Sequence, residues 1–462
     1  MLSLFNTLTD RKEEFAPLHD KTVGMYHCGP TVYNYPHVGN LRAYVFADIL
    51  KRALLYEGLS VTQVINITDV GHLVGDHDEG EDKVEAGARK EGKTAQEITE
   101  FYTQAFFDDI HALNIETTGT LFPRATENIE EQIALIKHLG EKGYTYVTSD
   151  GVYFDTSKFP DYGKLGNINL AGLSEGARVA ANTEKKNPTD FALWKFSQSA
   201  EKRQQEWESP WGTGFPGWHA ECSAMSMKFL GETFDIHTGG IDHIPVHHNN
   251  EIAQSEAATG KKFVRFWMHN AFINASGDVK MAKSEENFVR LAGIAEHGIH
   301  PIACRYWLLS AHYRSPMIFS WDALEAADVA LRKLNAHVLQ LPESEGKLAS
   351  PYHAEFKKLI EDDLDTPKVL ALLWKLVKDT QIKEEDKKAT ILDFDRVLGL
   401  NLSASLFEEG IIPQNVRELA EKREKSRVEK NWKEADALRE QILSLGYEIR
   451  DTEHGFFIGK KR

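Results

Sequence analysis

The sequence is poor in cysteine and has no long apolar run, and each shortage excludes a class of protein. Three cysteines, Cys28, Cys222 and Cys304, are too few in 462 residues for a disulfide framework, so the composition fits a reducing compartment. No window approaches the roughly 18 consecutive apolar residues that a membrane-spanning helix needs. The N-terminal segment MLSLFNTLTDRKEEF also lacks the basic and apolar parts of a signal peptide. We therefore expect a cytoplasmic protein with no membrane partner.

Basic residues are also in short supply, with 54 Lys and Arg against 70 Asp and Glu and a formal net charge of −16. This charge argues against indiscriminate coating of nucleic acid, although a local basic face is compatible with it. The length of 462 residues exceeds what one hydrophobic core usually fills, so we expect several domains.

The first strong pattern is a strand, a turn and a helix near the N-terminus. Apolar TVGMYHCG (22–29) predicts a buried strand, and LRAYVFADILKRALLY (41–56) has the apolar spacing of a helix that stops at Gly58. The β-branched run VTQVINITDV (61–70) predicts a second buried strand. Together they form a βαβ unit, which is typical of an α/β protein with a parallel sheet.

One motif resembles a phosphate-binding loop but lacks the context for it. Residues 87–94, GARKEGKT, match the pattern GxxxxGK[ST], yet the preceding acidic DEGEDKVEA cannot be the buried strand that such a loop must leave. Thr94 and Glu97 have the spacing of a capping box. We therefore predict an ordinary helix start at Thr94.

Four side chains have the chemistry of a metal site. Cys28 lies in the first βα turn, Cys222 lies at a small-residue helical start, and His247 and Glu251 are four residues apart on one helical face. Two thiolates, one imidazole and one carboxylate suit Zn²⁺. From spacing alone, core cysteines and a surface histidine explain the same residues equally well.

Two short segments could hold a polyphosphate. His37-Val-Gly39-Asn40 stands at a helix entrance, where free amides and the helix dipole attract phosphate. Lys280 and Lys283 are three residues apart and could follow charge that develops on a leaving pyrophosphate. The alternative for both lysines is an ordinary solvated loop.

These residues make the sequence similar to class I aminoacyl-tRNA synthetases, whose two signatures usually read HIGH and KMSKS. HVGN (37–40) and KMAKS (280–284) occur in the expected order with an insertion between them. More narrowly, the chain resembles the cysteinyl-tRNA synthetase family over nearly its full length. The segments that carry this resemblance are YHCGPTVYNYPHVGNLR, GWHAECSAM, FDIHTGGIDHIPVHHNNEIAQS, WMHNAF, RYWLLSAHYRSP, DDLDTPKVLALLW and ADALREQILSLGYEIRDT.

The resemblance implies a fold and a division into domains. The expected fold is an α/β class I synthetase with a Rossmann-like parallel-sheet catalytic domain, an insertion, a helical bundle and a small C-terminal α+β domain. The implied divisions are 20–122 and 211–269 for the two halves of the catalytic domain, 123–210 for the connective insertion, 270–320 for the KMSKS-loop and stem-contact region, 321–402 for a tRNA-binding helical bundle, and 403–462 for the anticodon-binding domain.

The resemblance also implies an activity and site residues. It implies activation of L-cysteine with ATP, release of pyrophosphate and transfer of cysteine to the 3′ end of tRNA(Cys), with one zinc ion that selects the substrate thiolate and Mg²⁺ accompanying ATP. We expect a monomer. The implied site residues are Cys28, Cys222, His247 and Glu251 for zinc; His37, Gly39, Asn40, Lys280 and Lys283 for ATP; His37, Lys280 and Lys283 for catalysis; and Thr68, Trp218 and Asp242 for the amino acid, with Asp242 a candidate partner of its ammonium group.

Three departures from the family pattern stand out. Asn40 replaces the second histidine of HIGH and Ala282 replaces the first serine of KMSKS, so a potential cation and a hydroxyl are lost. The acidic segment 71–82, GHLVGDHDEGED, stands where family sequences commonly resemble IDDKI. Any role of that family segment is therefore not transferred to this chain.

Three other functions fit part of the sequence. An ATP-dependent ligase that joins cysteine to a small amine would share the catalytic domain but would have little use for the C-terminal segment, in which 417–462 holds twelve basic and ten acidic residues. A zinc hydrolase built on His247, His248, Glu251 and Asp242 would leave KMAKS unexplained. A non-catalytic RNA-binding relative would not need both lysines.

Overall fold

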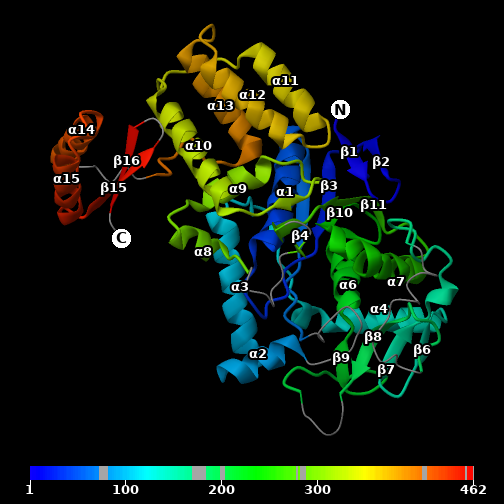
Figure 1. The fold of residues 1–462 in the computed structure, drawn as a ribbon. Coiled ribbons are helices and arrows are strands. Elements are labelled where there is room, and N and C mark those ends of the chain that lie inside the picture. The colour runs from blue at the N-terminus through cyan, green and yellow to red at the C-terminus, as the bar shows by residue number, and fades with distance from the viewer. Residues whose placement is uncertain are drawn as a thin grey trace. The chain divides into compact units, whose positions relative to one another are not determined.

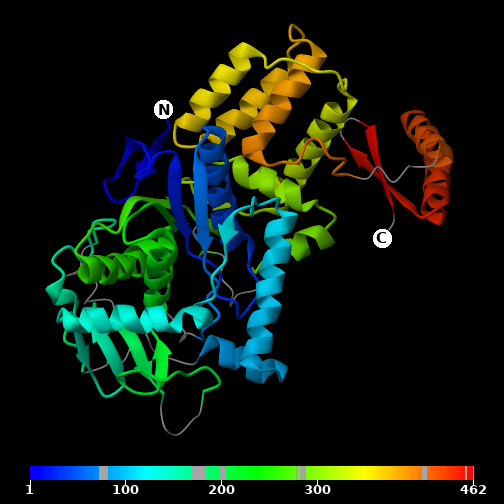
Figure 2. The same ribbon diagram turned by 180° about the vertical axis from the view of Figure 1, so that it is seen from behind.

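The computed structural model describes residues 1–71, 82–168, 184–197, 203–276, 279–280, 288–407, 414–452 and 455–460. The chain divides into two compact units, Met1–Ala404 and Ser405–Arg462 (Figures 1 and 2). The elements of the first unit up to its central sheet's last strand are β1 (Ser3–Asn6), β2 (Arg11–Glu14), β3 (Thr22–His27), α1 (Val38–Tyr56), β4 (Ser60–Ile65), α2 (Lys83–Glu91), α3 (Ala95–Ala112), β5 (Thr120–Leu121), η1 (Ala125–Asn128), α4 (Ile129–Glu141), β6 (Thr145–Val147), β7 (Gly151–Phe154), η2 (Thr156–Lys158), β8 (Phe191–Phe196), β9 (Gly214–Pro216), α6 (Trp218–Leu230), β10 (Phe234–Gly240), η3 (Ile241–His243), η4 (Ile244–His248), α7 (Asn249–Thr259) and β11 (Val264–Asn270).

The remaining elements lie toward the C-terminus. Those of the first unit are β12 (Ile273–Ser276), β13 (Val279–Lys280), α8 (Leu291–Glu296), α9 (Pro301–Leu309), β14 (Met317–Ile318), α10 (Trp321–Gln340), α11 (Ser350–Glu361), α12 (Thr366–Lys378) and α13 (Glu384–Leu398). Those of the second unit are α14 (Gln414–Val428), α15 (Trp432–Ser444), β15 (Tyr447–Thr452) and β16 (Gly455–Lys460).

A five-stranded parallel sheet in the order β11-β10-β3-β4-β5 forms the centre of the first unit. The predicted βαβ unit is confirmed, because β3 pairs in parallel with β4 and α1 connects them. Apolar strand residues such as Val23, Met25 and Val64 are fully buried, as expected for a sheet covered on both faces. The α/β class predicted from the sequence is therefore correct.

The order of the strands locates a crevice. From β3 the chain moves to β4 and β5 on one side, and later to β10 and β11 on the other side. The boundary between β3 and β10 is thus a topological switch point, where ligands bind beyond the carboxyl ends of parallel strands. Helix α1 packs on β4 and α3, whereas α6 packs on β3, α4 and α7.

The insertion carries a separate antiparallel sheet in the order β6-β7-β8-β9. Its last strand, β9, lies beyond residue 210, where the sequence analysis ends the insertion, and returns the chain directly to α6. Figure 1 shows β7, β8 and β9 in green beneath α4 and α6.

Helices dominate the rest of the chain. In the range 321–402, for which the resemblance implies a helical bundle, the structure has the helices α10 to α13, with fully buried Leu331, Phe356 and Phe394 among their core residues. In the second unit, α14 and α15 pack with the β15-β16 hairpin around Val416, Ala420, Ile442 and Ile449. Within the described ranges, no helix combines the length and apolar character needed to cross a bilayer.

Candidate functional site

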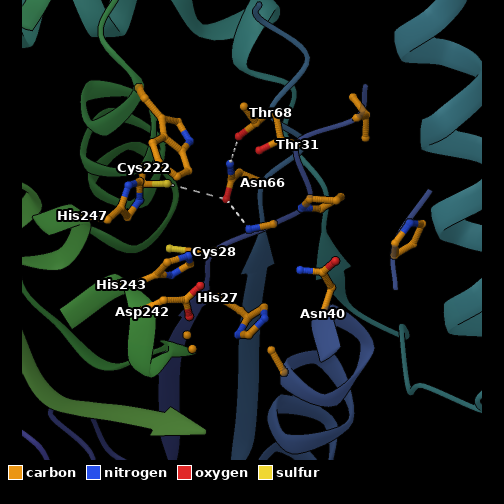
Figure 3. A pocket seen from close by; sticks show the side chains of 18 of the residues that line it. His27, Cys28, Thr31, Asn40, Asn66, Thr68, Cys222, Asp242, His243 and His247 are labelled. Atoms are coloured by element: carbon orange, nitrogen blue, oxygen red, sulfur yellow. Dashed lines mark hydrogen bonds between the residues drawn. The ribbon is translucent and has the colours of Figure 1, made fainter. Parts of the chain in front are cut away.

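A pocket of about 510 Å³ lies beyond the carboxyl ends of the central strands. Because β3, β4 and β10 run parallel, the segments that follow them emerge at the same edge of the sheet. Figure 3 shows Cys28, Cys222 and His247 on one side of this pocket and Asn40, at the start of α1, on the other side. The predicted site residues that line the pocket are Cys28, His37, Gly39, Asn40, Thr68, Trp218, Cys222, Asp242 and His247.

The four predicted metal ligands converge at one wall of the pocket, which three of them line. Cys28, Cys222, His247 and Glu251 each offer one ligand atom, and these atoms lie within 4.8 Å of one another. All four residues are buried. They come from four different elements, because Cys28 follows β3, Cys222 lies in α6, His247 in the π-helical turn η4 and Glu251 in α7. A site assembled from such distant parts of the chain depends on the folded domain, unlike the local clip of a zinc finger.

One contact in this cluster suggests a shared cation. His247 Nε2 lies 3.1 Å from Glu251 Oε1, yet within the described part of the chain this buried nitrogen has no hydrogen bond of acceptable geometry. The other ring nitrogen, His247 Nδ1, lies 2.9 Å from His219 Nδ1, which fixes the ring. A metal-ligating histidine usually has its second nitrogen held in this way. The residues can therefore hold a metal ion.

The charges of the cluster depend on close contacts in a buried environment. Burial opposes the protonated form of His247, but the adjacent Cys222 and Glu251 raise its pKa to about 10. Burial likewise opposes ionisation of Glu251, but His237 and His247 hold its pKa well below the usual range. Burial raises the pKa of the Cys28 thiol, whereas the hydrogen bond with Cys28 lowers the pKa of Cys222. The thiol of Cys222 is therefore easier to ionise than the thiol of Cys28.

Two histidines next to these ligands are absent from the predicted ligand set: His237, which the sequence analysis did not select, and His248, which it named only for the alternative of a zinc hydrolase. His237 Nε2 lies 2.9 Å from Glu251 Oε2, and His248 Nε2 lies 3.3 Å from Cys28 Sγ. Together with Cys28 and Glu251 they form a second possible ligand set within 4.8 Å. Because both sets use Cys28 and Glu251, they describe two positions for one ion in the same cluster. The sequence feature that could have indicated His237 and His248 is the high number of histidines in FDIHTGG and HIPVHH.

The helix entrance at the other end of the pocket is held by a reciprocal cap. The backbone N–H of Asn40 donates to His37 Nδ1 at 3.1 Å, and the backbone N–H of His37 donates to Asn40 Oδ1 at 3.2 Å. This arrangement is a capping box at the N-terminus of α1. A Cβ on Gly39 would approach the His37 ring to 2.9 Å, so a larger residue here would displace the ring that caps the helix. The amide of Asn40 thus stabilises the turn through its oxygen.

The three residues expected to hold an amino acid have different environments. Thr68 is buried and lies just after β4, while Trp218 begins α6 with its ring 4.7 Å from the His247 ring. Asp242 lies in η3 and is exposed. All three line the pocket, but they belong to three separate segments.

The lysine-bearing signature is only partly described. Lys280 is in β13, which pairs with β12. Ala282 and Lys283 lie outside the described residues, as do 72–81 of the acidic segment. Their expected roles stay predictions.

The rejected phosphate-loop motif has the structure predicted for it. Gly92 ends α2 in a left-handed conformation with φ of 64°, and Thr94 caps α3 in a capping box with Glu97. The backbone N–H of Thr94 donates to Glu97 Oε2 at 2.8 Å, and that of Glu97 donates to Thr94 Oγ1 at 3.2 Å. The motif therefore spans the C-terminus of α2 and the N-terminus of α3.

Asn66 is a pocket residue that the sequence analysis did not select. It follows β4, and its Oδ1 accepts a hydrogen bond from the Gly29 backbone N–H at 2.8 Å and lies 3.8 Å from Cys222 Sγ. The signal that could have found it is its place at the carboxyl end of the strand beside β3.

Comparisons with known proteins agree with this geometry. Residues 14–329 match the family of class I tRNA synthetases (C) catalytic domains. The chain is 48% identical over 454 residues to cysteine–tRNA ligase 1 of Burkholderia lata, covering 98% of this chain and 96% of that one. It is 44% identical to the cysteine–tRNA ligase of Treponema denticola, covering 97% of this chain and 98% of that one. Methionyl-tRNA synthetase from Mycobacterium tuberculosis, solved with methionyl-adenylate, shares the fold with a TM-score of 0.54 and 15% identity, over 82% of this chain and 90% of that one.

Proposed function

The chain belongs to the cysteine–tRNA ligase family of class I tRNA synthetases, and from this premise we propose that it activates L-cysteine with ATP and transfers it to tRNA(Cys). The carboxylate of cysteine attacks the α-phosphate of ATP, which breaks the bond to pyrophosphate and forms cysteinyl-adenylate. A hydroxyl of the 3′-terminal ribose of tRNA then attacks the adenylate carbonyl and releases AMP.

One observation carries this proposal, namely that a buried sulfur-rich cluster and a capped helix N-terminus face the same pocket. The cluster is suited to a thiol, and the helix end is suited to phosphate. Cys28 and His37 are only nine residues apart in the chain, separated by a turn that contains Gly29, Pro30 and Pro36. This short segment sets the distance from the captured side chain to the phosphate that its carboxylate attacks.

The donor set of the cluster supports zinc as the resident metal. Cys28, Cys222, His247 and Glu251 would hold it, since thiolate, imidazole and carboxylate are the ligands that Zn²⁺ takes in proteins. Bound zinc would supply affinity for a thiolate sulfur, which serine cannot offer because its hydroxyl is a hard and weakly acidic ligand. Trp218, in contact with the His247 ring, would cover this end of the pocket.

The remaining site residues are proposed for ATP and for the amino acid. His37, Gly39, Asn40, Lys280 and Lys283 would hold ATP with Mg²⁺, and His37 and the two lysines would act in the chemical step. Donors aimed at charge that develops on phosphate oxygens usually contribute the largest share of such catalysis. Thr68, Trp218 and Asp242 would bind the amino acid, and Asp242 is a candidate partner of its ammonium group.

The architecture outside the central sheet supports tRNA as the acceptor. The bundle at 321–402 and the C-terminal domain at 403–462 are proposed to bind tRNA, and the curated relatives match along both segments, covering 98% and 97% of this chain. The small-amine ligase has no support among these relatives. The hydrolase is disfavoured because, within the described residues, Asp242 belongs to neither ligand set. We propose a cytoplasmic monomer.

Aminoacylation of purified tRNA tests this function. The zinc-loaded protein, ATP and radiolabelled cysteine are expected to place label on tRNA(Cys) in acid-precipitable form. Label on a small amine without label on tRNA would contradict the proposal and restore the small-amine ligase.

Replacing Lys283 with alanine is expected to lower kcat of cysteine-dependent ATP–pyrophosphate exchange about 100-fold or more, the usual cost of one donor to developing charge. The matched control is Lys93→Ala, which removes the lysine of the phosphate-loop motif. Lys93 forms an ion pair with Glu91 at 2.8 Å beside a helix cap, and its loss should leave exchange unchanged. Loss of exchange in the Lys93 variant with retention in the Lys283 variant would reverse the assignment.

Replacing Asn40 with aspartate is expected to raise KM for ATP about tenfold, because a carboxylate near the phosphates repels them. Aspartate keeps the oxygen that accepts from His37 N–H, so the cap survives and the thermal midpoint should move by no more than about 2 °C. Exchange kinetics and thermal unfolding measured on one preparation separate the two effects. An unchanged KM for ATP would place the phosphates away from Asn40.

A further inference from the structure

Three buried polar side chains beside the thiol cluster form a directed chain of hydrogen bonds. Asn66, Thr68 and Glu221 are exposed by 1%, 2% and 0%. We infer that Asn66 and Glu221 are positioning residues, which orient the hydroxyl of Thr68 so that it can only accept a hydrogen bond from the α-ammonium group of the amino acid. This inference rests on the proposed function and assigns roles to Asn66 and Glu221, which have none among the predicted site residues.

The direction of the chain follows from a backbone amide. The N–H of Gly29 can only donate, and it donates to Asn66 Oδ1 at 2.8 Å. The oxygen of the Asn66 amide is therefore fixed toward Gly29, and its NH₂ group faces Thr68. Asn66 Nδ2 donates to Thr68 Oγ1 at 2.9 Å.

The proton of Thr68 is consequently directed away from Asn66. Thr68 Oγ1 donates to Glu221 Oε2 at 3.0 Å. A hydroxyl has one proton and two lone pairs. Because Glu221 takes the proton and Asn66 takes one lone pair, one lone pair is left to accept a further hydrogen bond.

The backbone holds Thr68 at the pocket wall. Its N–H donates to Pro30 O at 3.0 Å, and its carbonyl accepts from Val32 N–H at 3.2 Å, so the residue is fixed to the segment that follows Cys28. Asn66 and Thr68 line the pocket (Figure 3), and Asn66 Oδ1 lies 3.8 Å from Cys222 Sγ. Asn66 thus links Thr68 to the sulfur-bearing cluster.

The chemistry of cysteine selects the partner of this lone pair. With its sulfur at the cluster and its carboxylate ionised for attack, the group of cysteine left to donate hydrogen bonds is the α-ammonium. The carboxyl group of Glu221 behind Thr68 also favours a cation at this point. An ammonium has three N–H donors, so a contact with Thr68 leaves two for Asp242 or water.

Two truncated ligands test the inference on the zinc-loaded full chain. Cysteamine has the thiol and the ammonium but no carboxylate, whereas 3-mercaptopropionate has the thiol and the carboxylate but no ammonium. We compare their dissociation constants by calorimetry for wild type, Thr68→Val, Thr68→Ser and Glu221→Gln, with zinc content measured for each protein.

Thr68→Val should raise the dissociation constant of cysteamine about tenfold, which is the usual effect of losing one hydrogen bond to a charged group. It should leave the dissociation constant of 3-mercaptopropionate within about twofold of the wild-type value. Thr68→Ser should retain cysteamine binding because the hydroxyl is kept. Glu221→Gln keeps an accepting oxygen but removes the carboxylate. It should raise the dissociation constant of cysteamine about threefold or more, and its zinc content should be normal.

Equal weakening of both ligands by Thr68→Val, or unchanged cysteamine binding in both Thr68→Val and Glu221→Gln, would overturn the inference. A purely structural role of Thr68 would produce the first of these results. Failure of the proposed function is separate, because it would appear as absence of cysteine-dependent exchange in the wild type whatever the two ligands do.

Discussion

Replacing Cys222 with alanine is expected to abolish stoichiometric zinc binding and to lower kcat/KM for cysteine about 1000-fold. Loss of a group that merely supports a metal ligand costs about 10- to 100-fold in affinity or activity, so loss of a ligand should cost more. Cys222 is 2% exposed, and its neighbours His247 and Glu251 would be left without the thiol that completes the set. Zinc content by elemental analysis and cysteine-dependent ATP–pyrophosphate exchange measure the two effects.

Cys304 provides the matched control for this substitution. It is a fully buried thiol in α9 and belongs to neither possible ligand set in the part of the chain that is described. Cys304→Ala therefore removes a buried thiol without removing a ligand, and we expect unchanged zinc stoichiometry and exchange. If both variants lost zinc to the same degree, the loss would reflect general destabilisation and the assignment of Cys222 would be wrong.

Replacing Arg305 with methionine is expected to lower the free energy of unfolding by about 3 kcal/mol or more. It removes one of the two cations paired with the buried carboxylate of Asp48, the other being Arg52, and takes a donor away from two backbone carbonyls. Arg305 is fully buried and donates to the carboxylate of Asp48 in α1, to Leu398 O at 2.7 Å and to Leu113 O at 3.1 Å. One side chain thereby joins α9 to α1 and to the end of α13. Denaturant unfolding followed by tryptophan fluorescence measures the change. The signal reports mainly on the first unit, which contains Arg305, because only Trp432 of the nine tryptophans lies in the second unit.

The exposed ion pair between Lys12 and Asp362 is the control for the buried pair. Its side chains are 44% and 52% exposed, and surface pairs contribute about 0–1 kcal/mol. Lys12→Ala should therefore change the free energy of unfolding by less than about 1 kcal/mol. Similar losses for the two variants would mean that Arg305 contributes no more than a surface contact.

Local patterns predicted the parts of this protein that depend on neighbours in sequence. The first βαβ unit follows from apolar periodicity around Gly58, and the start of α3 follows from the spacing of Thr94 and Glu97. Both are set by contacts within a few residues. The convergence of Cys28, Cys222, His247 and Glu251 was suggested by ligand chemistry and family resemblance, and the structure places their ligand atoms within 4.8 Å.

Contacts between distant segments could not be predicted in the same way. The order of β10 beside β3 decides that His237 and His248 reach Glu251 and Cys28, and no local period reveals that order. The pairing of β9 with β8, beyond residue 210, likewise joins segments that are distant in sequence. The hydrogen bonds that run from Gly29 through Asn66 and Thr68 to Glu221 join three segments that are distant in sequence. They could therefore be found only in the folded structure.

The departure at Asn40 has a physical explanation in the structure. Its side-chain oxygen accepts from His37 N–H, while its backbone N–H donates to His37 Nδ1, so asparagine serves the helix cap directly. A histidine at this place could contribute a cation but would lack an oxygen acceptor. The loss of a possible cation is therefore accompanied by a capping oxygen at the N-terminus of α1.

Cysteine-dependent ATP–pyrophosphate exchange with serine as the comparison substrate tests the central claim most directly. The zinc-loaded protein should support exchange with cysteine. Its kcat/KM for serine should be lower by about 1000-fold or more, because the proposed zinc site binds the substrate's thiolate and serine has none. Equal exchange with the two amino acids would contradict selection by the buried cluster, and absence of exchange with cysteine would contradict the proposed reaction itself.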